Sequence, residues 1–116
     1  MGILDPLAME NLREMVGGDP HFMAELIDTF LEDAPHVLSN MRQALENGDP
    51  VMLHRAAHTF KSNSSEFGAT ALANLCRELE VMGKADSLEG ARELLARVEA
   101  EFAQAEAALE TVRQEL

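Results

Sequence analysis

The sequence predicts an all-α protein: an antiparallel four-helix bundle with a short additional N-terminal helix. The chain is rich in Ala, Leu and Glu, which favour helices, and poor in β-branched residues. Three Asp-Pro pairs, at 5–6, 19–20 and 49–50, precede segments with apolar residues at helical spacing. The connections between the long segments are short, so consecutive helices should be antiparallel neighbours.

The Asp-Pro pairs mark the starts of the first three helices. An aspartate side chain accepts hydrogen bonds from free amides at a helix start, and proline suits the first helical position. We therefore expect helices at about 6–16, 20–47 and 50–66, with glycines at 17–18 and 48 ending the first two. Pro35 lies inside the second segment and should kink it, because the apolar periodicity continues on both sides.

The second half of the chain predicts two more helices. Gly68 interrupts the pattern, and a helix at about 70–82 should follow and end at Gly83. Ser87 can cap a last helix at about 88–114. Its apolar residues recur every three or four positions, which indicates core packing. A dimerising coiled coil is the alternative, because the tail after Leu109 could extend past the bundle.

Length, charge and cysteine content limit the possible classes of protein. The 116 residues fit one domain, 1–116, whose core we expect to include Cys76 and the methionines at 15, 23, 41, 52 and 82. A net charge of -12 disfavours binding to nucleic acids and anionic membranes. No apolar run approaches the roughly 18 residues of a membrane span, and the N-terminus has no signal segment. We expect a monomeric cytoplasmic protein.

His58 occupies the centre of one face of the third predicted helix. On a helical wheel, the opposite side holds the core residues Leu53, Ala56, Phe60 and Phe67, with Met52 near its edge. His58 shares its own face with six residues. They are Val51, His54, Arg55, Lys61, Ser62 and Ser65. A buried core histidine is therefore excluded, which leaves a plain solvated face or an accessible reactive imidazole.

The neighbours of His58 favour a reactive imidazole. Ser62 and Ser65 follow it at intervals of one turn, and their small side chains leave the ring uncovered for a large partner. Lys61 lies one turn away and can place an ammonium beside a negative group on the ring. Val51, His54 and Arg55 would form a docking surface around it, or they are ordinary exposed residues.

The stretch from His58 to Ala69, HTFKSNSSEFGA, resembles the signature of histidine-containing phosphotransfer (HPt) domains. That signature is His, two residues, Lys, Gly, two small residues, and later an apolar residue followed by Gly and Ala. The spacing matches without a gap, although Ser62 replaces the usual glycine and Asn63 is bulkier than usual. The flanking segments LDPLAMENLREMVGGDPHFMAELIDTFLEDAP and LANLCRELE are also similar to the family, so the resemblance covers nearly the whole chain.

The resemblance implies a phosphorelay intermediate. His58 would accept a phosphoryl group from the phospho-aspartate of a response-regulator receiver domain and pass it to another receiver, with Lys61 pairing to the phosphate. The protein would be a carrier without turnover of its own, and it could work with, or be part of, a hybrid sensor histidine kinase. Mg²⁺ and the acidic pocket would belong to the receiver, so we expect no cofactor in this chain.

Other arrangements give weaker hypotheses. His54 and His58 have a spacing that can hold a metal, but Arg55 follows His54 where a zinc protease motif has Glu, so we expect no metal site. No nucleophile–base pair or glycine-rich phosphate loop is present. Glu78 and Glu80 are interpreted as solvated surface. The competing function is a helical adaptor that binds partners, with His58 incidental.

Overall fold

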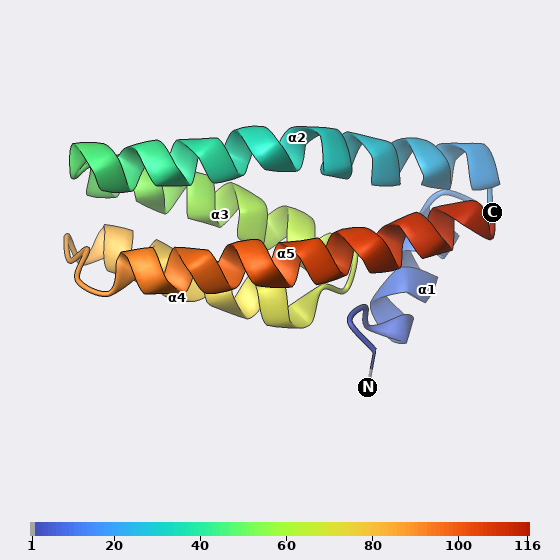
Figure 1. Ribbon diagram of the computed structural model, residues 1–116. Coiled ribbons are helices and arrows are strands. Elements are labelled where there is room, and N and C mark those ends of the chain that lie inside the picture. The colour runs from blue at the N-terminus through green and yellow to red at the C-terminus, as the bar shows by residue number, and fades with distance from the viewer. Residues whose placement is uncertain (1) are drawn as a thin grey trace.

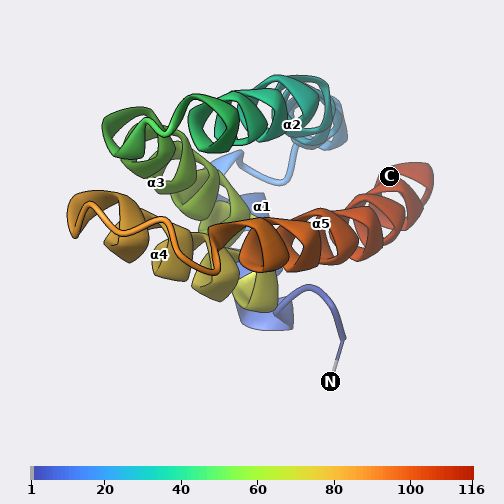
Figure 2. The same ribbon diagram turned by 60° about the vertical axis from the view of Figure 1, so that its left-hand side comes forward.

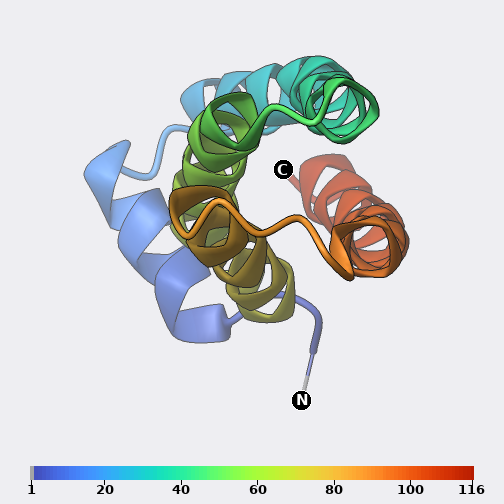
Figure 3. The same cartoon turned by 90° about the vertical axis from the view of Figure 1, so that its left-hand side faces the viewer.

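A computed structural model describes residues 2–116, which form five helices and, within that range, no strand. The helices are α1 (Pro6–Met15), α2 (Pro20–Asn47), α3 (Pro50–Glu66), α4 (Thr70–Lys84) and α5 (Ala91–Gln114). Helices α2 to α5 alternate in direction and form a four-membered ring, seen end-on in Figure 3. The predicted fold class, a four-helix bundle with an extra N-terminal helix, is confirmed.

The helices differ in length, and this shapes the two ends of the bundle. Helices α2 and α5 have 28 and 24 residues, whereas α3 and α4 have 17 and 15. The longer pair therefore extends beyond the shorter pair at one end, where α1 and the C-terminus lie (Figure 1). Figure 2 shows α2 and α3 on one side of the bundle and α4 and α5 on the other. Helix α1 contacts α3 from outside the ring.

The three aspartates cap their helices as the Asp-Pro pairs predict. The Asp5 side chain accepts a hydrogen bond from the Leu7 amide, and the Asp49 side chain accepts one from the Met52 amide. Asp19 caps α2 in the same way. Helix α2 then runs through Pro35 without a break to Asn47, so the apolar periodicity on both sides of the proline identified one helix.

Two helix ends lie within three residues of the expected positions. Helix α4 continues one residue past Gly83, to Lys84, and this glycine lies in close contact with α3. Helix α5 begins at Ala91, not near residue 88. Gly90 precedes it in the left-handed conformation with φ 82°, and no side chain caps it, so Ser87 is not its cap.

The core contains four of the five phenylalanines, together with aliphatic side chains from every helix. Phe30 and Phe60 stack with ring centroids 5.8 Å apart, and Phe67 and Phe102 pack against this pair. Met15, which the sequence analysis expected in the core, is 76% exposed, and the fifth phenylalanine, Phe22, is 51% exposed. Met15 is the last residue of α1 and Phe22 lies in the first turn of α2, where the bundle does not cover them.

Contacts far apart in the sequence fix both ends of the chain. The Asp5 amide donates to the Gly68 carbonyl at 2.8 Å, and a Cβ on Gly68 would lie only 2.9 Å from the Asp5 backbone. At the other end, the Arg113 guanidinium binds both carboxylate oxygens of Asp28, at 2.6 and 2.9 Å. Leu109 is buried and α5 stays against α2 beyond it, so the tail does not project as the coiled-coil alternative requires.

Candidate functional site

The outer face of α3 places His58 in solvent. Its side chain is 59% exposed, and Ala57 and Phe60, which flank it on the helix, are buried in the core. The helical wheel placed the other candidates on the same face, and they are exposed or half-buried there. Val51, Arg55, Ser62 and Ser65 are exposed, and His54 and Lys61 are half-buried.

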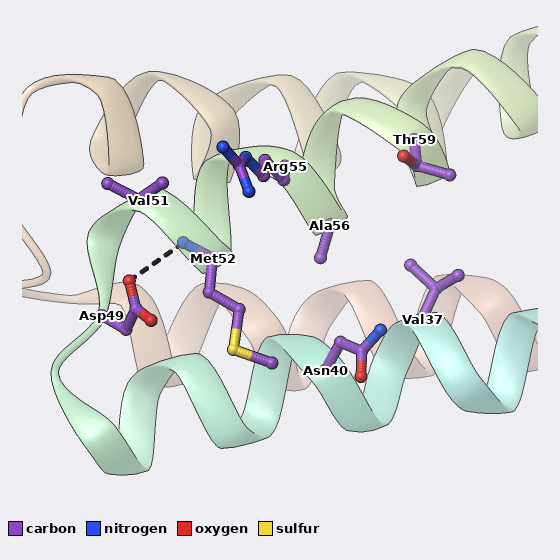
Figure 4. A pocket seen from close by; sticks show the side chains of 8 residues that line it. All are labelled: Val37, Asn40, Asp49, Val51, Met52, Arg55, Ala56 and Thr59. Carbon is purple, nitrogen blue, oxygen red and sulfur yellow. Dashed lines mark hydrogen bonds between the residues drawn. The ribbon is translucent and has the colours of Figure 1, made fainter.

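A shallow groove of about 430 Å³ runs beside this face, between α2 and α3 (Figure 4). Helix α2 contributes Val37 and Asn40 to it, and α3 contributes Val51, Arg55 and Thr59 among others. In Figure 4 the α3 side chains line one wall and the α2 side chains the other. Val51 and Arg55 therefore belong both to this groove and to the face that bears His58.

Glu80 of α4 binds the two α3 residues that the sequence signature singles out. Its Oε2 lies 2.5 Å from His58 Nδ1, and its Oε1 accepts a hydrogen bond of 2.6 Å from Lys61 Nζ. Only 14% of the Glu80 side chain is exposed, so the carboxylate is largely withdrawn from solvent where it meets the imidazole. The three side chains form a linked triad of ammonium, carboxylate and imidazole.

This arrangement fixes which nitrogen of His58 can react. The hydrogen bond from Lys61 and then that from His58 lower the pKa of Glu80, and burial only partly opposes them. An ionised carboxylate can only accept hydrogen bonds, so His58 Nδ1 must be the donor. In the neutral ring the lone pair is then on Nε2, the nitrogen remote from Glu80. The site thus presents a nucleophilic nitrogen to solvent.

The interpretation of Glu80 as solvated surface is wrong. The sequence held a signal that could have identified it: Ala73, Cys76 and Gly83 are buried at helical spacing on α4, and Glu80 falls on the same stripe. Small residues on one stripe of a helix indicate close approach of a neighbour. A carboxylate within such a stripe needs a partner, and α3 provides two. Glu78 is exposed, as expected.

His54 also binds Glu80, but through the backbone. Its Nδ1 lies 3.1 Å from the Glu80 carbonyl oxygen, and its ring is nearly parallel to that of His58, with centroids 6.4 Å apart. Helices α3 and α4 touch at this level, because a Cβ on Gly83 would lie 2.7 Å from the His54 amide nitrogen and from the Pro50 carbonyl oxygen.

The two histidines do not assemble a metal site in the structure. Across residues 2–116, no three His, Cys, Asp or Glu side chains gather as metal ligands. The Nδ1 atoms of both rings are already occupied by Glu80. The described helices also include none that is long and apolar enough to cross a bilayer.

Comparisons with known proteins identify the family of this chain. Residues 25–114 match the Hpt domain. The chain is 30% identical over 104 residues to histidine-containing phosphotransfer protein 2 of Arabidopsis thaliana, covering 87% of this chain and 67% of that protein. It is 26% identical over 93 residues to multistep phosphorelay regulator 1 of Schizosaccharomyces pombe, covering 79% of this chain but only 32% of the yeast protein.

A solved structure is similar over nearly the whole chain. The crystal structure of histidine-containing phosphotransfer protein B (HptB) from Pseudomonas aeruginosa PAO1 has a TM-score of 0.89 and 34% sequence identity. The alignment covers 98% of this chain and 96% of HptB. Sequence signature, helical bundle and exposed histidine agree, and the chain belongs to the Hpt domain family of histidine phosphotransfer intermediates in phosphorelays.

Proposed function

We propose that His58 is the phosphoacceptor of this phosphorelay intermediate, receiving the phosphoryl group from one receiver domain and passing it to another. The supporting observation is the hydrogen bond from His58 Nδ1 to Glu80, which leaves the Nε2 lone pair free on a side chain that is 59% exposed. Membership of the family implies phosphorelay partners such as receiver domains and kinases. Hpt phosphotransfer proteins carry phosphoryl groups rather than catalyse turnover, and we infer the same for this chain.

The transfer step needs little from the chain beyond placement of the nucleophile. The His58 Nε2 lone pair attacks the phosphorus of an aspartyl phosphate on the partner. The N–P bond forms as the P–O bond to the aspartate breaks, and the aspartate carboxylate leaves with the electron pair. The proton on Nδ1 stays in its hydrogen bond to Glu80, whose negative charge stabilises the positive charge that develops on the ring. The reverse sequence delivers the group to the next receiver.

Lys61 supports the phosphoryl group in this proposal. Its ammonium is held within one turn of His58 by Glu80 and remains 29% exposed, so it can exchange a Glu80 oxygen for a phosphoryl oxygen. Phosphoryl transfer depends mainly on alignment and charge neutralisation. The partner receiver would supply Mg²⁺ and the acidic pocket, and no cofactor is required from this chain.

The distribution of charge favours docking on the α3–α4 side. Residues 50–84 hold four of the nine basic residues and only three of the 21 acidic ones, a net charge of +1, whereas the rest of the chain carries −13. An acidic receiver pocket would therefore be repelled less by helices α3 and α4 than by the rest of the chain. We infer that Val51, Arg55, Ser62 and Ser65, with His54 beside them, form the docking face, together with the groove in Figure 4.

We further infer a monomeric cytoplasmic carrier that does not bind nucleic acid. The negative charge outside residues 50–84 would repel a polyanion, and the only cysteine, Cys76, is buried and reduced, which suits a reducing compartment.

A labelling experiment separates a carrier from an adaptor. The protein is incubated with a phosphorylated receiver domain, and we expect an acid-labile, alkali-stable label on the wild type and none on His58→Gln. His36→Gln is the matched control, because His36 is an exposed histidine on α2. Equal labelling of wild type and His58→Gln, or no labelling of either, would leave the adaptor as the better explanation.

A further inference from the structure

We propose that His54 is a positioning residue for the phosphoacceptor: it holds the backbone of Glu80 so that the Glu80 carboxylate stays within hydrogen-bond distance of His58 Nδ1. The inference rests on the proposed role of His58. Three α3 side chains converge on Glu80, two on its carboxylate and one on its carbonyl oxygen. His54 is the one that binds the backbone, at 3.1 Å.

The Glu80 backbone needs such support because it lies near a helix end. Helix α4 stops at Lys84, four residues later, and its last turn contains Gly83, a weak helix former. The helical partner of the Glu80 carbonyl is the amide of the residue four positions on, which is Lys84 itself. The exposed connection 85–90 follows at once. Terminal turns fray readily, and fraying here would release the carbonyl of the residue that orients His58.

The His54 bond holds this turn whatever the charge of its ring. A carbonyl oxygen can only accept, so His54 Nδ1 must carry the hydrogen, in the neutral ring as in the protonated one. The approach of Gly83 keeps the two helices in contact beside this bond, since a Cβ at that position would meet the His54 backbone at 2.7 Å. Backbone contact and hydrogen bond thus fix Glu80 relative to α3.

Loss of the His54 bond should show in the tautomer of His58. If the last turn of α4 loosens, the carboxylate no longer stays at hydrogen-bond distance from His58 Nδ1. The neutral ring can then place its proton on Nε2, where it blocks the nucleophilic lone pair. A merely structural tether would affect stability without moving this proton.

The test compares His54→Leu with His54→Asn. Leu lacks the hydrogen-bond donor but is a better helix former than His, so helix propensity cannot explain a slower labelling of His58. The amide nitrogen of Asn can take the place of His54 Nδ1 and should restore the hydrogen bond to the Glu80 carbonyl. Ring ¹⁵N shifts of His58 report its tautomer, and phosphoramidate, a small phosphoryl donor, reports its labelling rate without any partner. We expect His54→Leu to lower the Nδ1–H fraction and to slow labelling by about fivefold, the factor for a hydrogen bond worth about 1 kcal/mol, with His54→Asn close to wild type.

A double mutant tests whether His54 acts through Glu80. In a Glu80→Ala background, His54→Leu should cause no further change, because the carboxylate that it positions is gone. His54→Ala repeats the comparison in case Leu prevents folding, which circular dichroism reports. A His58 tautomer unchanged in both His54→Leu and His54→Ala, or full additivity with Glu80→Ala, would overturn the inference. The tautomer is read without phosphoryl transfer, so failure of His58 to accept a phosphoryl group would instead count against the proposed function.

Discussion

Replacing Gly83 by alanine sets helix propensity against the contact between α3 and α4. In an exposed helix interior the substitution would stabilise by about 1 kcal/mol. Here the new methyl would lie 2.7 Å from the His54 amide nitrogen and the Pro50 carbonyl oxygen, and 2.9 Å from the His54 Cβ. Backbone atoms cannot rotate away, so the cost should reach the upper part of the range of about 1–3 kcal/mol for overpacking. We therefore expect a net loss of about 1–2 kcal/mol in the free energy of unfolding.

Urea denaturation followed by circular dichroism measures this loss, with Val81→Ala as the control. Val81 is exposed on the same helix, so its replacement gains helix propensity without a clash. The same variant should slow labelling of His58, because α4 must move away from α3 and take Glu80 with it. A Gly83→Ala protein that is more stable than wild type would refute the close approach of the two helices at this point.

Four further predictions concern the core, the triad of Lys61, Glu80 and His58, and the cysteine. Phe60→Ala should cost about 3–5 kcal/mol of unfolding free energy, since the ring is fully buried; urea denaturation checks this. Lys61→Ala should slow labelling of His58 yet change the unfolding free energy by less than about 1 kcal/mol, because its ion pair is partly exposed. The pKa of the Glu80 carboxyl is lower in the folded protein than in the unfolded chain. Ionised Glu80 therefore stabilises the fold fully above the unfolded pKa of about 4.3, and this contribution is lost as the pH falls below it. The difference in unfolding free energy between wild type and Glu80→Gln should shrink accordingly. Burial raises the pKa of Cys76 to about 12, so iodoacetamide should modify it only after unfolding.

The helix starts and the face of His58 could be predicted because they depend on local chemistry. An aspartate before a proline satisfies helix-start amides whatever the rest of the chain does, so the caps at Asp5, Asp19 and Asp49 followed from the sequence. The periodicity of α3 likewise placed Phe60 inside and His58 outside.

The errors arose where a residue's role depends on a neighbouring helix. Glycine is common at helix ends, so Gly83 alone suggests that a helix ends there, but the proximity of α3 makes it a packing residue. In the sequence, Glu80 resembles many other surface carboxylates; only the fold places His58 and Lys61 within hydrogen-bond distance of it. Met15 was assigned to the core from its apolar character, although no element covers the end of α1. Such roles can be predicted only when it is known which helix faces pack against one another.

The contact between Asp5 and Gly68 has a practical consequence for where an excised fragment of this protein can begin. The family match starts at residue 25, inside α2, but a fragment cut there would lose α1 with its buried residues Met9 and Leu12. Leu12 lines a small cavity together with Phe67, so truncation would open an aromatic surface directly behind the segment that bears His58. We therefore expect a stable fragment to include Asp5, and shorter expression products to be prone to aggregation.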